Sequence, residues 1–436
     1  MDPGCDLRDP DRGAGAETDR AARDAGAGEV NQAATAKSPS PPRRFNLRER
    51  IRDRETAVYS ILLIVAILFP IVDIYSNDGG TADVSQATRA GTFVLLAIGL
   101  NVVVGFAGLL DLGYAAFYAI GAYTYALFAS LQLQSSPLHH AVHVNFWIMI
   151  FVSMFVAAAF GAILGFPTLR LRGDYLAIVT LGFGEIVPQL FYNFDNWTGG
   201  INAIGLIDQP HLPFWLQGPW SGDGDFKVVQ NFNFNSDPVA FYVLIVILIA
   251  LAVILVNNLY KSRLGRAWMA IREDEVAAAA MGINTVTTKL LAFSIGASFS
   301  GFAGAYYAAN IALVSPDNFL FLVSITVLVM VVLGGMGSIS GVIVGALTLY
   351  FVIFYLIPGL PQNVTNFAGT IGLSDNVANA ISDATTRLNF IIYGLILVLM
   401  MLLRPQGILP SRVREQELKH AAVQEDEAAV EMSHQG

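Results

Sequence analysis

The sequence is poor in charged residues and has a single cysteine. Charged residues occupy 14% of the 436 positions and hydrophobic residues 54%, with a mean hydropathy of +0.55. This composition excludes an ordinary soluble globule of this length and indicates a polytopic membrane protein. Cys5 has no second cysteine with which to form an internal disulfide. A net charge of −9 gives no support to a nucleic-acid partner.

Motifs of catalytic chemistry are also missing. The P-loop pattern GxxxxGK[ST] does not occur, and none of the five lysines follows a glycine, so we expect no ATP site in this chain. HEXXH, GxSxG and paired CxxC motifs do not occur either. We therefore expect a non-catalytic chain without a bound cofactor. His139, His140 and His143 have no cysteine or carboxylate close by in the sequence, so we expect solvated loop histidines and no metal site.

Long apolar runs make up most of the chain. A run of roughly 20 residues is needed to cross about 30 Å of hydrocarbon. Such runs lie at 57–75, 88–109, 112–131, 146–166, 175–192, 238–257, 288–308, 319–334, 339–358 and 388–403. They predict an all-α fold, a polytopic transmembrane helical bundle of about ten helices. Glycine and proline interrupt 175–192 and 319–358, which are the candidates for broken or re-entrant helices.

Basic residues set the expected orientation and domain limits. Residues 1–42 lack an apolar period and end in SPSPP, which predicts a disordered tail. The juxtamembrane segment 43–56 holds six arginines and favours a cytosolic amino terminus. Threading the spans from there gives a transmembrane domain at 57–403, with loop 258–287 and tail 404–436 in the cytosol. The long loop 193–237 is then on the outer side, where it either docks a substrate-delivering protein or caps the bundle.

Loop 258–287 is polar among oily neighbours. Glu273, Asp274 and Glu275 favour the start of a short helix, because carboxylates suit its positive end and Asp274 can cap free amides. Gly282 is expected to end that helix. The intervening VAAAAM is too short to be stable alone in water. We expect a partner subunit to supply the surface that holds it.

Ionisable residues within the apolar runs are further candidates, because they are costly in lipid. Glu185 lies within a span and Asp111 at the junction of two spans. For Glu185 the competing interpretation is a carboxylate that only packs against a neighbouring helix. A proton-coupled transporter that acts alone usually needs a chain of such ionisable groups. Glu185 and Asp111 by themselves give that function little support.

Several segments resemble the LivM-type permeases of bacterial branched-chain amino-acid ABC importers. They are GLNVVVGFAGLLDLGYAAFYAIGAYTYAL (99–127), LRLRGDYLAIVTLGFGEIV (169–187), and GRAWMAIREDEVAAAAMGIN continuing through LLAFSIGASFSGFAGAYYA to VVLGGMGSISGVIVGA. The closing LLRPQGILP (402–410) resembles the family's carboxyl-terminal signature. Together they cover most of residues 90–410.

The resemblance implies a multi-pass subunit in a bacterial inner membrane, in contact with lipid. Its expected partners are a LivH-like permease homologue, two ABC ATP-binding subunits that bind ATP and Mg, and a periplasmic amino-acid-binding protein. The polar loop then couples to the ATPase, through Gly265, Arg272, Glu273, Asp274, Glu275, Ala278 and Gly282. In many importers this loop follows an EAA…G pattern, whereas here Glu275 and Gly282 stand one residue further apart. The expected translocation path involves Asn101, Gly105, Asp111, Tyr114, Tyr118, Tyr123 and Glu185.

Two alternatives stay open at this point. The first is an ABC permease for urea or another small solute, because related permeases have similar sequences. In either ABC permease, the second membrane subunit is a homologue or another copy of this chain. An ion-coupled secondary transporter, acting without ATPase subunits, is the alternative from a different class. The dedicated cytosolic loop favours the ABC permease.

Overall fold

The computed structural model describes residues 47–76, 82–132, 143–168, 174–210 and 238–359, and the single positions 391, 394, 395, 398, 402, 408 and 409. The chain divides into two units, Met1–Val58 and Tyr59–Gly436. The predicted tail 1–42, loop residues 211–237, and most of the last span and of tail 404–436 lie outside the described residues. The start of helix α2 belongs to the first unit, and every contact given below lies within the second.

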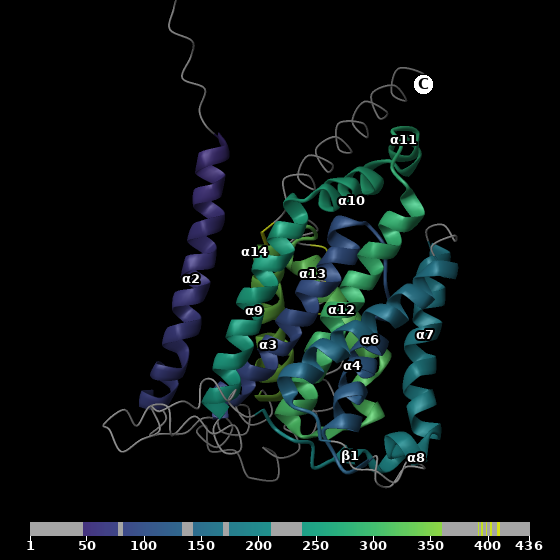
Figure 1. Ribbon diagram of the computed structural model, residues 1–436. Helices are drawn as coiled ribbons and strands as arrows, with labels where there is room; N and C mark the ends of the chain where they lie inside the picture. The colour runs from purple at the N-terminus through teal and green to yellow at the C-terminus, as the bar shows by residue number, and fades with distance from the viewer. Residues whose placement is uncertain are drawn as a thin grey trace, which may run out of the picture. The chain divides into compact units, whose positions relative to one another are not determined.

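The described chain is almost entirely helical (Figure 1). Its α-helices are α2 (Leu47–Ser76), α3 (Ala82–Leu100), α4 (Tyr114–Phe128), α6 (Phe146–Thr168), α7 (Asp174–Asn193), α8 (Asp195–Thr198), α9 (Pro238–Lys261), α10 (Arg263–Glu273), α11 (Glu275–Ala280), α12 (Thr285–Ile311), α13 (Phe321–Gly334) and α14 (Ile339–Tyr350). Two π-helices, η2 (Asn101–Phe106) and η6 (Phe351–Leu356), continue α3 and α14. Short 3-10 turns are η3 (Gly200–Asn202) and η5 (Pro316–Phe319), and strands β1 (Ile204–Gly205) and β2 (Leu313–Val314) pair antiparallel.

Seven helical segments of the described chain are long and apolar enough to cross a membrane. They lie at 83–106, 146–168, 175–193, 238–261, 285–311, 316–334 and 339–359. The all-α, polytopic prediction is therefore confirmed. Of the other predicted spans, 57–75 contains a shorter apolar helix, Val58–Asp73, 112–131 contains α4 with only 15 residues, and 388–403 lies mostly outside the described residues.

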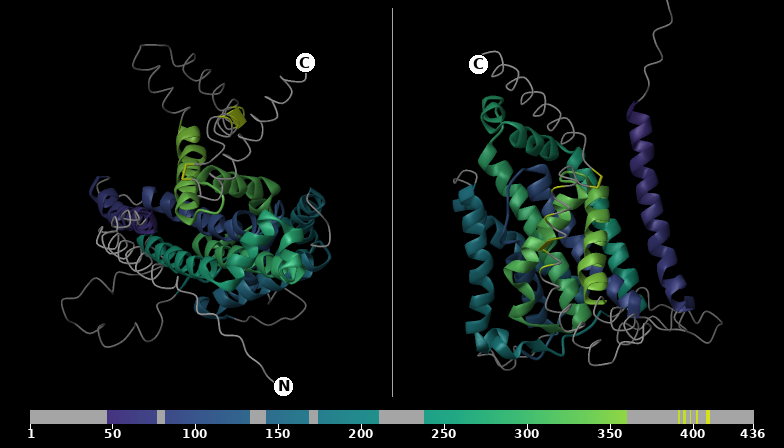
Figure 2. Two further views of the ribbon diagram at one scale, coloured as in Figure 1. Left: turned by 90° about the horizontal axis from the view of Figure 1, so that it is seen from above. Right: turned by 180° about the vertical axis from the view of Figure 1, so that it is seen from behind.

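Helix α12 occupies the centre of the bundle, with α4, α6 and α3 packed on it (Figures 1 and 2). Glycines allow these helices to approach closely. A side chain at Gly121 of α4 would collide with the backbone of Gly301 in α12, and one at Gly161 of α6 would press on Ala297. Small residues at such crossings are how membrane helices gain packing energy where lipid is as apolar as the side chains.

Helix α2 continues past a proline because another helix satisfies the carbonyl that the proline leaves free. Pro70 has no N–H group and cannot donate to the carbonyl of Ala66 one turn earlier. The hydroxyl of Tyr242 in α9 donates to this oxygen at 2.9 Å, and its ring lies 6.0 Å from that of Phe69. The bond replaces the missing intrahelical one and links α9 to α2.

The principal interruption of regular helix falls between η2 and α4, at the junction where the sequence prediction separated the spans 88–109 and 112–131. Residues 107–113 are non-helical, and Asp111 is 1% exposed. In contrast, 175–192 forms one continuous helix despite Pro188, so its interpretation as a broken or re-entrant segment is wrong. The region 319–358 is divided into α13 and α14 at a turn that contains Gly335 and Gly337, both with positive φ.

Part of the loop 193–237 folds over one end of the bundle, which we call the α8 end; the opposite end, with α10 and α11, we call the α10–α11 end (Figure 1). The amide of Asp208 donates to the carbonyl of Ala129 at 2.7 Å, and the Tyr125 hydroxyl donates to the Asp208 carbonyl at 2.6 Å. Strand β1 pairs with β2 at the same end. Residues 193–210 of this loop therefore cap the bundle.

The segment near the carboxyl terminus returns to α13 and α14. The amides of Ile408 and Leu409 donate to the carbonyls of Leu333 and Gly334, at 2.7 and 3.2 Å. These carbonyls lie in the last turn of α13 and lack intrahelical donors. The LLRPQGILP segment thus contributes hydrogen bonds where α13 ends.

Candidate functional site

Helix α10 is amphipathic and is fixed to the end of the bundle. Ser262 begins it by accepting a hydrogen bond from the amide of Gly265 at 3.2 Å, as a helix N-cap does. Trp268 is fully buried, and its indole N–H donates to the carbonyl of Thr288 in α12 at 2.7 Å. Because α10 and α12 are joined by this buried bond, we expect them to move together.

Helix α11 follows after a single extended residue, Asp274, as predicted. The Oδ1 atom of Asp274 accepts hydrogen bonds from the amides of Val276 and Ala277, at 2.8 and 3.0 Å, so the expected cap is present. Gly282, with φ +86°, follows the helix and turns the chain towards α12. The predicted short helix, with its cap at Asp274 and its end at Gly282, is therefore confirmed as local structure, whereas Glu273, predicted at its start, is the last residue of α10.

The exposed surface of α11 is apolar. Val276 is 76% exposed and Met281, just after the helix, is 84% exposed, whereas Ala278 is buried. The carboxylate of Glu275 pairs with the ammonium of Lys289 in α12 at 2.6 Å. A six-residue helix gains little stability by itself, so its cap and this ion pair hold it in place with its apolar side chains facing outward.

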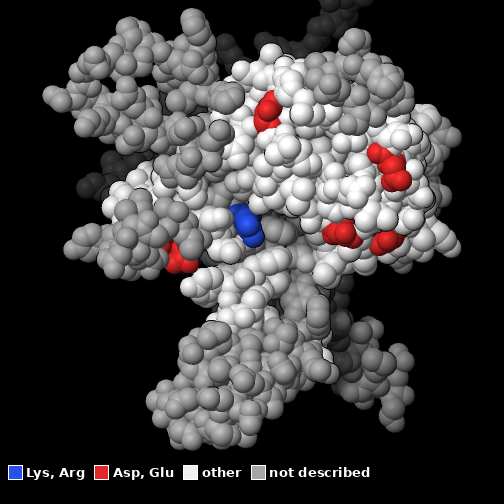
Figure 3. Space-filling model, turned by 90° about the horizontal axis from the view of Figure 1, so that it is seen from below, with Lys and Arg blue, Asp and Glu red and all other residues white. Residues whose placement is uncertain are grey.

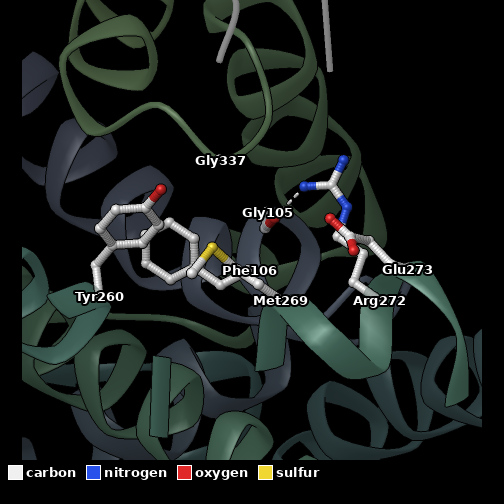
Figure 4. A pocket seen from close by; sticks show the side chains of 7 residues that line it. All are labelled: Gly105, Phe106, Tyr260, Met269, Arg272, Glu273 and Gly337. Atoms are coloured by element: carbon white, nitrogen blue, oxygen red, sulfur yellow. Dashed lines mark hydrogen bonds between the residues drawn. The ribbon is translucent and has the colours of Figure 1, made fainter. Parts of the chain in front are cut away.

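Arg272 connects this polar segment to the π-helix η2. Its Nη1 atom donates to the carbonyl of Gly105 at 2.5 Å, and the aliphatic part of its side chain lies against Gly108. Figure 4 shows the guanidinium pointing to Gly105, with the Glu273 carboxylate beside it. A π-helix inside an α-helix is a common mark of a functional position. Arg272 therefore links α10 directly to the end of the broken span.

The hollow around Arg272 is a joint between elements and too small for a substrate. It is lined by Gly105, Phe106, Tyr260, Met269, Arg272, Glu273 and Gly337 (Figure 4). Its volume is about 20 Å³, which is room for about one water molecule. Beside it, the amide of Gly337 donates to Oδ1 of Asn101 at 2.9 Å. The joint therefore brings together α9, α10, η2 and the turn between α13 and α14.

The non-helical residues 107–113 are held by polar groups inside the protein. The Leu112 amide donates to the Thr180 hydroxyl of α7 at 3.1 Å. The Ala115 amide, at the start of α4, donates to the Ser324 hydroxyl of α13 at 2.8 Å, and the Gly113 amide donates to Asp111 at 2.9 Å. Irregular backbone at membrane depth requires such internal partners, because lipid offers none. Asp111 therefore has a structural task at the break.

The tyrosines predicted for the translocation path are buried in the described chain. The Tyr114 hydroxyl donates to the carbonyl of Gly296 in α12 at 3.2 Å. Tyr118 packs against Phe319, with ring centres 5.0 Å apart, and Tyr123 packs against Phe191 of α7, with ring centres 4.2 Å apart. These side chains fill the interior between α4, α7, α12 and η5. Their role in the path stays a prediction.

The other predicted path residues fall at three separate places. Asn101 and Gly105 lie at the joint with Arg272, and Asp111 lies at the break. Glu185 is exposed on α7. The structure thus brings Gly105 together with the coupling residue Arg272, whereas Glu185 is exposed and the path tyrosines are buried.

Within the described residues, no group of three His, Cys, Asp or Glu side chains could hold a metal ion. His143 pairs with Asp208 at the α8 end, with 2.5 Å between Nδ1 and Oδ2. His139 and His140 lie outside the described residues.

Sequence reasoning missed several residues that position the site. Trp268, Thr180 and Ser324 each bond to a segment far away in the sequence, so no local pattern identifies their partners. The N-cap at Ser262 could have been predicted from the sequence, because serine is a preferred N-cap residue and Ser262 stands directly before α10. Gln189 and Asn193 could also have been identified from the sequence, since they follow Glu185 at intervals of four residues and so lie on the same side of a helix.

Comparison with known proteins places these features in one family. Residues 84–401 match the family model described as the permease component of branched-chain amino acid transport systems. The chain is 39% identical over 373 residues to the high-affinity branched-chain amino acid transport system permease protein LivM of Escherichia coli K12, which covers 84% of this chain and 78% of the relative. No solved structure matched the chain.

More distant relatives carry related names. The permease protein BraD of Pseudomonas aeruginosa is 27% identical, over 75% of this chain and 94% of its own. The permease protein LivH of Salmonella typhimurium is 25% identical, over 74% of this chain and 92% of its own. The family model spans more than half of the sequence and includes the broken span, α10 and α11. The chain therefore belongs to the family of permease components of branched-chain amino acid transport systems.

Proposed function

We propose that this chain is the membrane-spanning permease subunit of an ATP-driven importer that carries branched-chain amino acids across the bacterial inner membrane. The names of its relatives support this substrate class. The observation that carries the proposal is α11, a capped helix that holds Val276 and Met281 outward at one end of the bundle. Exposed apolar side chains on a polar segment favour contact with another protein.

Charge supports a cytosolic position for the α10–α11 end. Lys261, Arg263 and Arg266 are exposed there. Figure 3 looks onto the α8 end, where the described surface shows mainly acidic side chains. Cytosolic loops of membrane proteins carry an excess of lysine and arginine. This orientation is also the one predicted from the loops of the sequence.

The remaining parts of the importer are other subunits. Two ABC ATP-binding subunits bind ATP and Mg and contact α11, a LivH-like permease forms the second half of the membrane domain, and a periplasmic amino-acid-binding protein delivers substrate at the α8 end. In this arrangement the chain itself performs no chemistry and binds no cofactor.

Movement of α11 reaches the membrane interior by two routes. The Trp268 bond joins α10 to the central helix α12, and Arg272 joins α10 to η2 beside the break at 107–113. ATP binding closes the ATPases and shifts α11, and both routes pass that shift to helices that pack through the bundle. Alternating access then follows from the rocking of packed helices against one another.

The docking role is tested by replacing Val276 and Met281 with glutamate. Each charge removes apolar contact, and we expect the doubly substituted permease to co-purify with at least about tenfold less ATPase at unchanged permease yield. Val286→Glu, at another exposed apolar residue of this end, is the matched control and should retain the ATPase. Full retention by the double variant would refute the docking assignment.

The transport role is tested with the reconstituted complex. Vesicles holding both permeases and the ATPases, supplied with the binding protein, should accumulate radiolabelled leucine only with ATP. Uptake of urea in place of leucine would identify a small-solute permease. Leucine uptake driven by an ion gradient without the ATPases would identify a secondary transporter.

A further inference from the structure

Helix α7 has one face buried in the protein and a polar stripe exposed on the other. Gly184 packs against Gly113 of the break, and Thr180 and Val187 are buried on the same side. The polar stripe consists of Glu185, Gln189 and Asn193, spaced four residues apart and all exposed. Residues at this spacing lie along one side of a helix.

The stripe starts near the middle of α7, a helix long and apolar enough to cross a membrane. Glu185 lies about 16 Å along α7 from Asp174, at a rise of 1.5 Å per residue, and the hydrocarbon core is about 30 Å thick. No hydrogen bond or ion pair joins the Glu185 carboxylate to another described residue. A carboxylate without a partner at this depth cannot face lipid at low cost. Something polar must cover it in the assembled protein.

The surface beside the stripe is apolar and therefore suited to contact with lipid. Helix α7 thus presents a polar strip and an apolar strip side by side. Val179, Ile186 and Leu190 form an apolar strip next to the polar one, 38%, 64% and 46% exposed. The border between the two strips is an open surface formed by Glu185, Ile186, Gln189, Leu190 and Asn193. Gly182 lies on the same exposed side of α7, and a Cβ added there would meet no atom within 4 Å. The described chain therefore leaves this part of the α7 surface uncovered.

The stripe is continued by polar groups at the α8 end and by apolar ones at the other. The Tyr192 hydroxyl, next to Asn193 at this end of α7, bonds to the carboxylate of Asp317 in η5. Towards the α10–α11 end, the exposed side chains of Ile178 and Tyr175 follow instead. Along α7, the surface thus changes from polar to apolar near the middle of the membrane.

We propose that the polar stripe of α7 lines the hydrated substrate path, and that the Glu185 carboxylate pairs there with the α-ammonium group of a passing amino acid. A ligand with a cationic head and an aliphatic side chain matches a lone carboxylate followed by the open surface at Gly182 and Ile178. Gln189, one turn away, offers amide groups to the same ligand. This inference rests on the proposed function for its substrate class.

Water access is tested by labelling cysteines. Cys5 is the chain's one cysteine, so Cys5→Ser gives a cysteine-free background. Gln189→Cys and Asn193→Cys in the assembled complex should react with membrane-impermeant thiosulfonates. Val179→Cys on the apolar strip and Phe155→Cys on α6, 67% exposed, should stay unreactive. If the stripe packs against a partner helix, positions 189 and 193 will also be unreactive, and the inference fails.

The charge of Glu185 is tested at the same position. A cationic reagent should label Gln189→Cys about tenfold faster than an anionic one of equal size, because a carboxylate in a narrow path concentrates cations. Adding Glu185→Gln should remove this preference, and Glu185→Asp should keep it. An unchanged preference in Glu185→Gln would overturn the role of the carboxylate. This readout needs no transport, so it separates failure of the inference from failure of the proposed function.

Transport then tests the pairing with substrate. Glu185→Gln should lower ATP-driven leucine uptake by about tenfold, the loss expected when a charged hydrogen-bond partner is removed. Glu185→Asp should restore part of it, and ATPase co-purification should not change in either variant. Val179→Ala is the matched control on the same helix. Full uptake by Glu185→Gln would overturn the pairing.

Discussion

The break at 107–113 and the α10–α11 segment are both departures from regular membrane helix, yet they are stabilised in opposite ways. The break is buried, and its amides bond to Thr180 and Ser324 from other helices. Helix α11 is exposed and is held by its local cap at Asp274 and by the ion pair between Glu275 and Lys289. Substitutions in the interior should therefore act on folding, and substitutions at the exposed segment should act on coupling between subunits.

The largest expected effect is in the interior. Gly121→Leu places a side chain against the backbone of Gly301 in the central helix, and overpacking of this kind costs about 1–3 kcal/mol or more. We expect most folded permease to be lost, as measured by its monodisperse yield in mild detergent. Gly182→Ala, where no atom lies within 4 Å, should keep the yield. A normal yield of the leucine variant would show that the α4–α12 contact is less rigid than described.

A smaller effect is expected at the joint between the two regions. Arg272→Ala leaves the Gly105 carbonyl without its guanidinium donor, and a hydrogen bond to a charged group contributes about 1.5–3 kcal/mol. Leucine uptake should fall about tenfold while ATPase co-purification and permease yield are retained. Arg272→Lys, which keeps a cationic donor, should recover part of the uptake. If the alanine variant loses the ATPase as well, Arg272 belongs to the docking surface and not to the transmission.

The smallest effect is expected at the exposed segment. Asp274→Ala removes the acceptor for the amides of Val276 and Ala277, and loss of an N-cap costs about 1 kcal/mol. ATPase affinity should weaken about fivefold, with no change in thermal stability of the permease. Asp274→Asn preserves an N-cap acceptor and should bind the ATPase normally. A large fall in thermal stability would mean that α11 contributes to the fold itself.

The same contrast explains what could be predicted from the sequence. Hydropathy located the spans, and the α11 helix was predictable because Asp274 caps amides only two and three residues away. The junction between the spans 88–109 and 112–131 was predicted as well, but its hydrogen-bond partners were not, since Leu112 and Ala115 bond to residues 68 and 209 positions away. Pro188 misled the prediction for α7, because a proline does not by itself break a helix held by its neighbours. Glu185 was visible as a charge, but only the fold shows that it is exposed together with Gln189 and Asn193.

The hydrogen bonds from Ile408 and Leu409 to the end of α13 have a consequence for biosynthesis. The chain emerges from the ribosome with its amino terminus first. Helices α13 and α14 therefore enter the membrane before Ile408 and Leu409 have been translated. Until then the carbonyls of Leu333 and Gly334 lack these donors, and the turn beside the Arg272 joint is incomplete. A nascent chain that stops before Ile408 thus lacks hydrogen bonds that stabilise the turn beside the Arg272 joint. The fold is complete only when the segment with Ile408 and Leu409 has packed against the end of α13.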